Sequence, residues 1–214
     1  MSKKPIQVFY IHGAPTFKNR KQYVEYISKR GVYLDSLKRW HGDFLSKKLG
    51  KWFKVVKTQM PNPDNGIYKD RKIHFERLIP LLDEELIIIW NSLWGIFIVK
   101  YLSENKFPKK LISLYLVAAP YDNNLVKASK FSIPWQELVG WFTLGKDLSR
   151  IEKVTKNIHL LYSSDDEIVA LAHAEKYKKK LKSADLTIFD NVKGHFRTTE
   201  FPEIVKMIKQ DIKK

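Results

Sequence analysis

Short apolar runs alternate with helix-like segments along this 214-residue chain, and this alternation limits the fold more than any other feature. A strand that is apolar throughout needs cover on both faces, which the intervening helices of a parallel sheet supply. The sequence therefore predicts an α/β fold with a mostly parallel sheet of about six strands and helices on both faces. The expected strands are Gln7–Ile11, Phe53–Thr58, Glu85–Ile89, Ile112–Val117, Ile158–Tyr162 and Leu186–Phe189, and the expected helices span about 35–49, 67–82, 93–104, 171–182 and 202–213.

Size and composition favour one globular domain over residues 1–214, because hydrophobic residues make up 44% of the chain and charged residues 29%. The chain has no cysteine, which excludes disulfides, thiolate catalysis and cysteine-based metal sites. The apolar run behind the basic residues Lys3 and Lys4 is short and leads directly into His12-Gly13, so we expect a strand there and a cytoplasmic protein.

We expect no membrane-spanning helix. The most apolar stretch, residues 86–102, contains Asn91, Ser92 and Lys100 and is shorter than the ~20 apolar residues that a spanning helix needs. A buried strand followed by a buried helix accounts for it.

The formal net charge is +16, from 39 basic and 23 acidic residues. Such a charge attracts anionic partners, so weak binding of anions or nucleic acids is one interpretation. The other is a solvated, lysine-rich surface, because the lysines are spread over most of the predicted helices. We expect no specific nucleic-acid partner.

A serine lies where an apolar strand changes into a helix, in the hexapeptide Trp90-Asn91-Ser92-Leu93-Trp94-Gly95. Serine nucleophiles of hydrolases occupy such a turn, usually within G-x-S-x-G, because the strained backbone brings the residues two before and two after the serine close together. Both of those positions are tryptophan here, Trp90 and Trp94. Taken alone, a serine at this position is more often a helix N-cap than a nucleophile.

An acid and a histidine follow later strands. A serine reacts at neutral pH only if a base takes its proton, and a carboxylate improves that base by orienting it. Asp165 and Asp166 follow the strand that ends at Tyr162, and Gly194-His195 follows the next strand. The two aspartates could instead cap the following helix.

The turn after the first strand, His12-Gly13-Ala14-Pro15, offers a backbone N–H at Ala14, and Leu93 offers the N–H after the serine. Together these two N–H groups would form an oxyanion hole that needs no metal ion. We expect a pocket lined by His12, Trp90 and Trp94 beside it. The glycine and proline could also serve only to make a tight turn.

One segment interrupts the alternation of strands and helices. Residues 120–150 carry several aromatic residues in an irregular context: Phe131, Trp135, Trp141 and Phe142. They could form a cap over an apolar substrate pocket, with Trp135 and Trp141 in its lining, or could simply pack a long loop against the sheet.

Together these motifs resemble the small single-domain α/β-hydrolases related to retinoblastoma-binding-protein-type serine hydrolases and the bacterial YdeN proteins. The resemblance extends over nearly the whole chain and includes His12-Gly13, the turn around Ser92, Asp165-Asp166 and Gly194-His195. It implies Ser92 as nucleophile, Asp166 as acid and His195 as base. It also implies hydrolysis of a small-molecule carboxylic ester without a metal or organic cofactor.

Trp90 and Trp94 depart from this family's pattern and leave two hypotheses open. Two large side chains beside a strained turn could press the helix away from the strand, which would leave an impaired enzyme or a non-catalytic binding protein. Alternatively, small residues on neighbouring elements could accommodate both rings and leave the turn intact.

Overall fold

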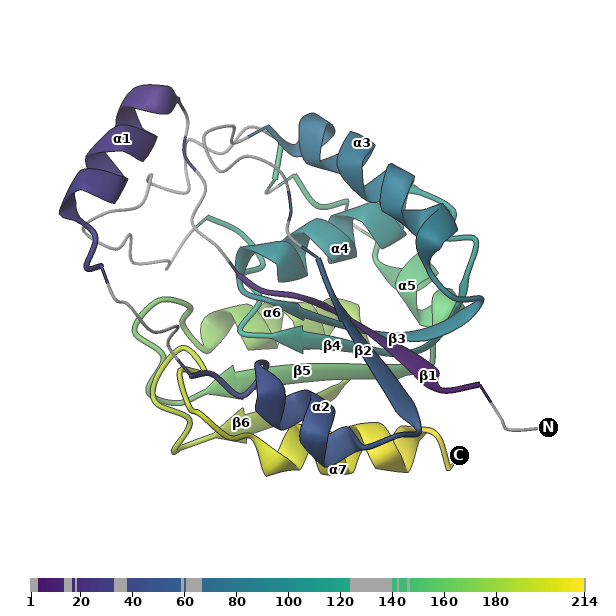
Figure 1. The fold of residues 1–214 in the computed structure, drawn as a ribbon. Coiled ribbons are helices and arrows are strands. Elements are labelled where there is room, and N and C mark those ends of the chain that lie inside the picture. Colours follow the sequence, from purple (N-terminus) through teal and green to yellow (C-terminus); the bar gives the residue numbers. More distant parts are fainter. Residues whose placement is uncertain are drawn as a thin grey trace.

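The computed structural model describes residues 4–13, 17, 19–32, 38–58, 60, 67–123, 140–141, 143–145 and 147–213. Its centre is one six-stranded sheet with the strand order β2-β1-β3-β4-β5-β6, in which every neighbouring pair is parallel (Figure 1). The predicted parallel sheet of six strands is therefore confirmed. The strands are β1 (Ile6–Ile11), β2 (Phe53–Lys57), β3 (Glu85–Asn91), β4 (Lys110–Val117), β5 (Asn157–Ser163) and β6 (Asp185–Phe189).

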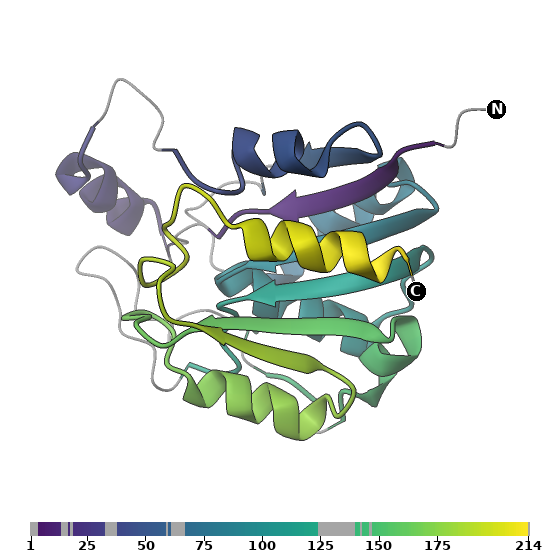
Figure 2. The same ribbon diagram turned by 90° about the horizontal axis from the view of Figure 1, so that it is seen from below.

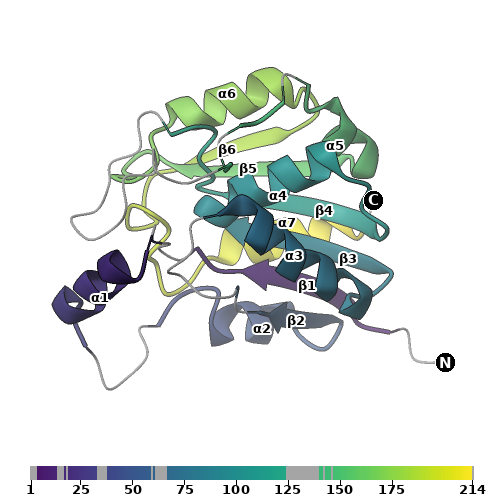
Figure 3. The same ribbon diagram turned by 90° about the horizontal axis from the view of Figure 1, so that it is seen from above.

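Helices cover both faces of the sheet, as predicted. One face packs against α3 (Tyr68–Leu78), α4 (Leu93–Glu104), α5 (Ser149–Val154) and α6 (Ala172–Lys180), and the other against α2 (Asp43–Leu49) and α7 (Pro202–Asp211). Figures 2 and 3 show these two layers from opposite sides. The central strands β3 and β4 are buried almost throughout, which explains why their sequences are apolar without alternation.

The predicted helices agree with the structure except at the start of the first one. That helix, expected from about residue 35, begins at Asp43, and residues 33–37 lie outside the described residues. The helix expected over 67–82 ends in a 3-10 turn at Ile79–Leu81, where Pro80 supplies no N–H for a further α-helical turn.

Two helices were not predicted, α1 (Arg20–Lys29) and α5. No residue of α1 is fully buried, although Tyr23 and Tyr26 are partly buried against the apolar core on the α3–α4 face. Tyr23, Val24, Tyr26 and Ile27 recur at helical spacing, a signal of an amphipathic helix that the prediction did not use. The start of α1 is also marked by an N-cap residue: the side chain of Asn19 accepts a hydrogen bond from the Gln22 N–H at 3.1 Å. Figure 2 shows α1 on the side of the molecule toward which the strand arrowheads point.

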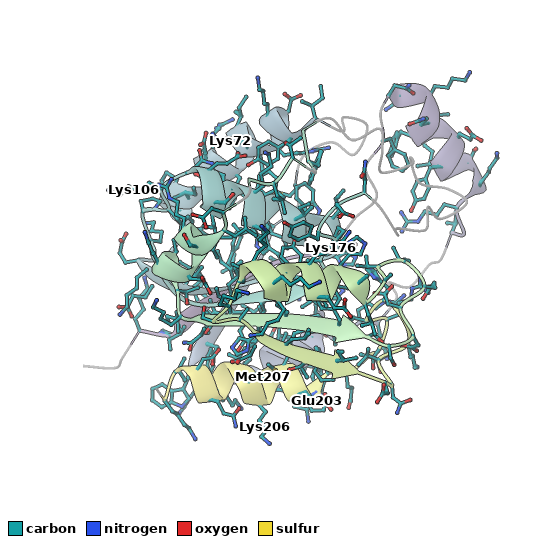
Figure 4. All side chains as sticks on the ribbon, turned by 180° about the vertical axis from the view of Figure 1, so that it is seen from behind. Lys72, Lys106, Lys176, Glu203, Lys206 and Met207 are labelled. Atoms are coloured by element: carbon teal, nitrogen blue, oxygen red, sulfur yellow. The ribbon has the colours of Figure 1, made fainter. Side chains whose placement is uncertain are left out.

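Lysines lie on many different elements of the surface. Figure 4 labels Lys72 on α3, Lys106 after α4, Lys176 on α6 and Lys206 on α7. Within the described part of the chain, no helix has the length and apolar character needed to cross a membrane.

A buried carboxylate fastens the last helix to the sheet. Asp211 Oδ2, near the end of α7, accepts hydrogen bonds from Ser113 Oγ at 2.7 Å and Tyr115 Oη at 2.6 Å on β4. The same oxygen lies 2.9 Å from His159 Nε2 on β5. Although burial opposes ionisation, the hydrogen bonds from these three side chains leave the pKa of Asp211 below its usual value.

We expect Asp211→Asn to lower the free energy of unfolding by about 3 kcal/mol, because the amide leaves buried donors poorly satisfied. Chemical denaturation at pH 7 measures the loss. Asp185→Asn, at an exposed position on β6, is the matched control and should change stability little. Equal stability of the Asp211 variant and the wild type would contradict a role for this carboxylate in anchoring α7.

Candidate active site

Three predicted site residues follow three different strands of the sheet. Ser92 comes directly after β3, Asp166 comes after β5, and His195 comes after β6. Since all six strands are parallel, their carboxyl ends share one edge of the sheet, and the loops that follow them are on the same side of the molecule.

The backbone at Ser92 adopts the strained turn expected from the sequence. Ser92 has φ 55° and ψ −132°, a region that residues other than glycine rarely occupy. Two hydrogen bonds hold the turn: the Ser92 N–H donates to Val117 O at 2.8 Å, and the Gly95 N–H donates to Ser92 O at 2.8 Å. Ser92 occupies the N-cap position of α4, but its side chain makes no capping hydrogen bond. The hydroxyl is therefore not used as a helix cap.

Trp90 and Trp94 are both accommodated without opening this turn. Trp90 is completely buried, with its ring centroid 5.1 Å from that of Phe75 and 5.6 Å from that of Phe97. The Trp94 ring packs against Trp141 at 5.3 Å. Both tryptophans belong to the apolar core on the α3–α4 face of the sheet, so their bulk lies within the packing of that layer.

Helix α4 approaches the sheet closely at Gly95, three residues after the serine, whereas the usual motif has its small residue two after the serine. Gly95 packs against Ala119, which follows β4, so closely that a Cβ atom on Gly95 would lie 2.4 Å from the Ala119 Cβ. These two small residues let α4 lie against the end of β4. This contact was not predicted, although a glycine directly after Trp94 and the pair Ala118-Ala119 after a strand are visible in the sequence.

The loop after β1 lies directly against Ser92. A Cβ atom on Gly13 would come within 2.7 Å of the Ser92 Cβ and 3.1 Å of Asn91 O, so only glycine fits at this contact. Leu93 begins α4, and its N–H has no acceptor within the helix. Ala14, the other predicted oxyanion donor, lies outside the described residues.

The structure brings Asp166 and His195 together. Asp166 Oδ2 lies 2.7 Å from His195 Nδ1, and the aspartate side chain is only 1% exposed. The other carboxylate oxygen, Oδ1, accepts the backbone N–H groups of Ile168 at 2.8 Å and Val169 at 3.0 Å. Asp166 therefore both holds the turn that follows it and contacts the histidine. It does not cap the following helix, α6, whose N-cap is Leu171 without a side-chain capping hydrogen bond.

Asp165 supports the loop that carries His195. Its Oδ2 accepts the Gly194 N–H at 3.1 Å, and its Oδ1 accepts a hydrogen bond from Ser163 Oγ. These hydrogen bonds, with that from Ser163 the largest cause, lower the pKa of Asp165. The two adjacent aspartates thus act on the same loop, one through its backbone and the other through the imidazole.

Two further histidines lie near this edge. The His12 ring stacks on that of His41, with centroids 4.5 Å apart. Burial, with the charges of His195 and Arg39, lowers the pKa of His12 to about 4. Burial, with His12, Lys57 and Arg39, lowers the pKa of His41 to about 3. Both imidazoles are therefore neutral at pH 7. The sequence placed His12 in the pocket but assigned His41 to a helix.

The aromatic segment can be followed only in part. Trp141 is completely buried and packs against Trp94 and Phe97, so this end of the segment covers α4. Trp135 and most of residues 120–150 lie outside the described residues, so the predicted cap stays a prediction. Among the described residues, no three His, Asp or Glu side chains are grouped so that they could hold a metal ion.

Solved structures with the same arrangement identify the fold. Similarity to the ydeN gene product of B. subtilis covers 98% of this chain and 100% of that one, with a TM-score of 0.72 and 21% sequence identity. The chain has the α/β-hydrolase fold. A carboxylesterase of the Thaumarchaeon Nitrososphaera gargenis matches 98% of the chain with a TM-score of 0.60 and 12% identity, covering 90% of its own length.

A third α/β-hydrolase neighbour is 2-hydroxy-6-oxo-6-phenylhexa-2,4-dienoate hydrolase from Rhodococcus sp. strain RHA1. It matches 98% of this chain and 91% of its own, with a TM-score of 0.60 and 16% identity. No family model matches the sequence, and no curated protein matches it either. At these identities the structural neighbours establish the fold alone.

The contact between Gly95 and Ala119 predicts that Gly95→Ala is poorly tolerated. The added methyl group has no room, so we expect a loss of about 1–3 kcal/mol in the free energy of unfolding. Gly145→Ala is the matched control, because the nearest atom to its new Cβ would be 3.8 Å away. Thermal denaturation compares the two. If both variants are equally stable, α4 does not depend on this contact.

The lowered histidine pKa values predict acid destabilisation. In the unfolded chain, His12 and His41 take up protons near the ordinary histidine pKa of 6.5. In the folded protein the pKa is about 4 for His12 and about 3 for His41, so both stay unprotonated to lower pH. The free energy of unfolding should therefore fall as the pH is lowered from about 6.5 to about 4.

His41→Phe removes one of these groups and keeps a flat ring, so its stability should fall less over the same pH interval. Urea denaturation at pH 7.5, 6, 5 and 4 measures the difference, with the values at pH 7.5 as reference. Parallel stability curves for the wild type and His41→Phe would show that His41 is not held neutral.

Proposed function

We propose that this protein is a serine hydrolase that acts on carboxylic esters. The observation that carries the proposal is the combination of a strained Ser92, whose side chain does not cap α4, with the Asp166–His195 hydrogen bond at the same edge of the sheet. A strained backbone persists only where its surroundings hold it, and here two hydrogen bonds and the Gly13 and Gly95 contacts do so.

The proposed reaction has two stages. Ser92 Oγ attacks the ester carbonyl carbon while His195 Nε2 accepts the hydroxyl proton, and the Leu93 N–H, with that of Ala14, stabilises the oxyanion. The intermediate collapses as His195 returns the proton to the leaving alcohol. Water then attacks the acyl-serine with His195 again as base, which releases the acid and restores Ser92.

Asp166 is proposed to orient the base. With a proton on Nδ1, His195 donates to Asp166 Oδ2 and leaves Nε2 free to accept the proton of Ser92. The Ile168 and Val169 N–H groups keep the carboxylate in place on its other side. The structural neighbours agree with this reaction class, since one is a carboxylesterase and another a hydrolase. The mechanism uses only side chains, backbone amides and water.

A non-catalytic binding protein on the same scaffold is the second candidate. The observation that favours it is the burial of Trp94 and Trp141 beside the first turn of α4, because their rings fill space that could otherwise hold an acyl group. Replacing both Trp90 and Trp94 by glycine would be a poor test. Trp90 packs against Phe75 and Phe97, and its removal would cost about 3–5 kcal/mol through the cavity left behind.

Labelling with a fluorophosphonate probe distinguishes the two candidates. We expect the wild type to be labelled and to hydrolyse p-nitrophenyl acetate, and Ser92→Ala to lose both properties. Ser103→Ala is the matched control, because its hydroxyl lies on the same helix and bonds to the Lys100 carbonyl. A folded wild type that takes no label, or a labelled Ser92→Ala, would overturn the hydrolase proposal.

Asp166→Asn tests the role of the carboxylate. The amide cannot hold the imidazole in the productive tautomer, so kcat should fall by about 10⁴ with a smaller change in KM. Asp190→Asn is the control, since this exposed aspartate lies on the same connection after β6 and bonds to Ser164 Oγ. Steady-state kinetics measure kcat and KM of both variants. An unchanged kcat in Asp166→Asn would show that Asp166 does not orient the base.

A further inference from the structure

The dipeptide Trp40–His41, just before α2, lies between two loops of the candidate site. The His41 ring stacks on two neighbouring rings: the Tyr10 centroid is 4.8 Å away with 14° between the ring planes, and the His12 centroid is 4.5 Å away with 27°. Tyr10 belongs to β1, and His12 is the first residue after that strand. His41 therefore holds the start of the loop that reaches Ser92 through Gly13.

Trp40 contacts the other loop. Its backbone N–H donates to Thr198 O at 3.1 Å, three residues after His195. Its fully buried indole ring packs edge-to-face on Phe201, with centroids 5.4 Å apart, and on Tyr10 at 5.6 Å. The segment that carries His195 has neither helix nor strand between Phe189 and Pro202, so it depends on such contacts for its position.

We propose that Trp40–His41 is a positioning element, which holds the loop after β1 and the loop carrying His195 in a fixed relation to each other. This inference rests on the proposed function for its catalytic consequence. Ser92 is contacted from the first loop by Gly13, and the base is carried on the second. A shift of the second loop would change the distance between the nucleophile and its base, and a shift of the first would change the contact that Gly13 makes with Ser92.

The character of the two residues suits this role. Trp40 is buried in the apolar core of the α2–α7 face and contacts both Tyr10 and the loop carrying His195. His41 is only partly buried and contacts the first loop through its flat ring. Neither side chain is charged at neutral pH: tryptophan does not ionise, and burial keeps the pKa of His41 far below 7. A flat ring that stacks is what the position requires, so phenylalanine should replace histidine there and alanine should not.

The kinetic test compares His41→Ala with His41→Phe. A displacement of about 1 Å between reacting groups can cost roughly a hundredfold in rate. We expect His41→Ala to lower kcat by about 10- to 100-fold with little change in KM, and His41→Phe to restore most of it. Measurements are made well below the midpoint of thermal unfolding of every variant, so that all of the protein is folded.

His159→Ala is the matched control. His159 also stacks on a tyrosine, Tyr115, with centroids 4.4 Å apart, but it lies near the start of β5 and bonds to Asp211, away from the carboxyl ends of the strands. This variant should lose stability and keep its kcat. If His159→Ala lowers kcat as much as His41→Ala does, or if His41→Ala keeps the wild-type kcat, the positioning role is wrong.

Amide hydrogen exchange tests the coupling independently of activity. His41→Ala should speed exchange in both loops, at residues 12–13 and at residues 190–201, while His159→Ala should leave both unchanged. Faster exchange in one loop only, or in neither, overturns the proposal. If the wild type neither hydrolyses esters nor takes the fluorophosphonate label, the proposed function fails, and the exchange result still decides whether Trp40–His41 joins the two loops.

Discussion

The contact between Gly95 and Ala119 allows the strained turn at Ser92 to exist. A serine at φ 55° is unfavourable by itself. The Ser92 N–H holds the turn to Val117 O as a continuation of the β3–β4 pairing, and the Gly95–Ala119 contact lets α4 leave the turn close against the end of β4. Any side chain at residue 95 would separate these elements. A methyl group added at residue 95, three residues after the serine, therefore has no room unless α4 or the end of β4 moves.

This contact also explains how two tryptophans can flank the serine. In the usual elbow, small residues two positions before and after the serine provide the room. Here Trp90 and Trp94 turn into the aromatic core of the α3–α4 layer, where Phe75, Phe97 and Trp141 surround them. The rings become part of the packing that supports α4. Their bulk therefore need not strain the turn, because the close approach has moved to Gly95.

The loops around Ser92 are held mainly by side chains. Asp165 binds the Gly194 N–H, Asp166 binds the His195 imidazole, and Trp40–His41 contacts the loops on both sides. Near the other end of the sheet, Asp211 collects three side-chain hydrogen bonds and anchors α7. Polar groups are buried at both ends for different purposes: at one they fasten a helix, and at the other they orient groups that could react.

Local sequence patterns predict the six parallel strands, the helices on both faces, and the order in which Ser92, Asp166 and His195 follow their strands. These features are encoded locally, because apolar runs and strand-to-loop boundaries are visible in consecutive residues. The compensation for Trp90 and Trp94 and the stacking of His41 on Tyr10 and His12 become visible only in the folded protein. Both depend on contacts between segments far apart in the chain, and such contacts leave no periodic signal in the sequence.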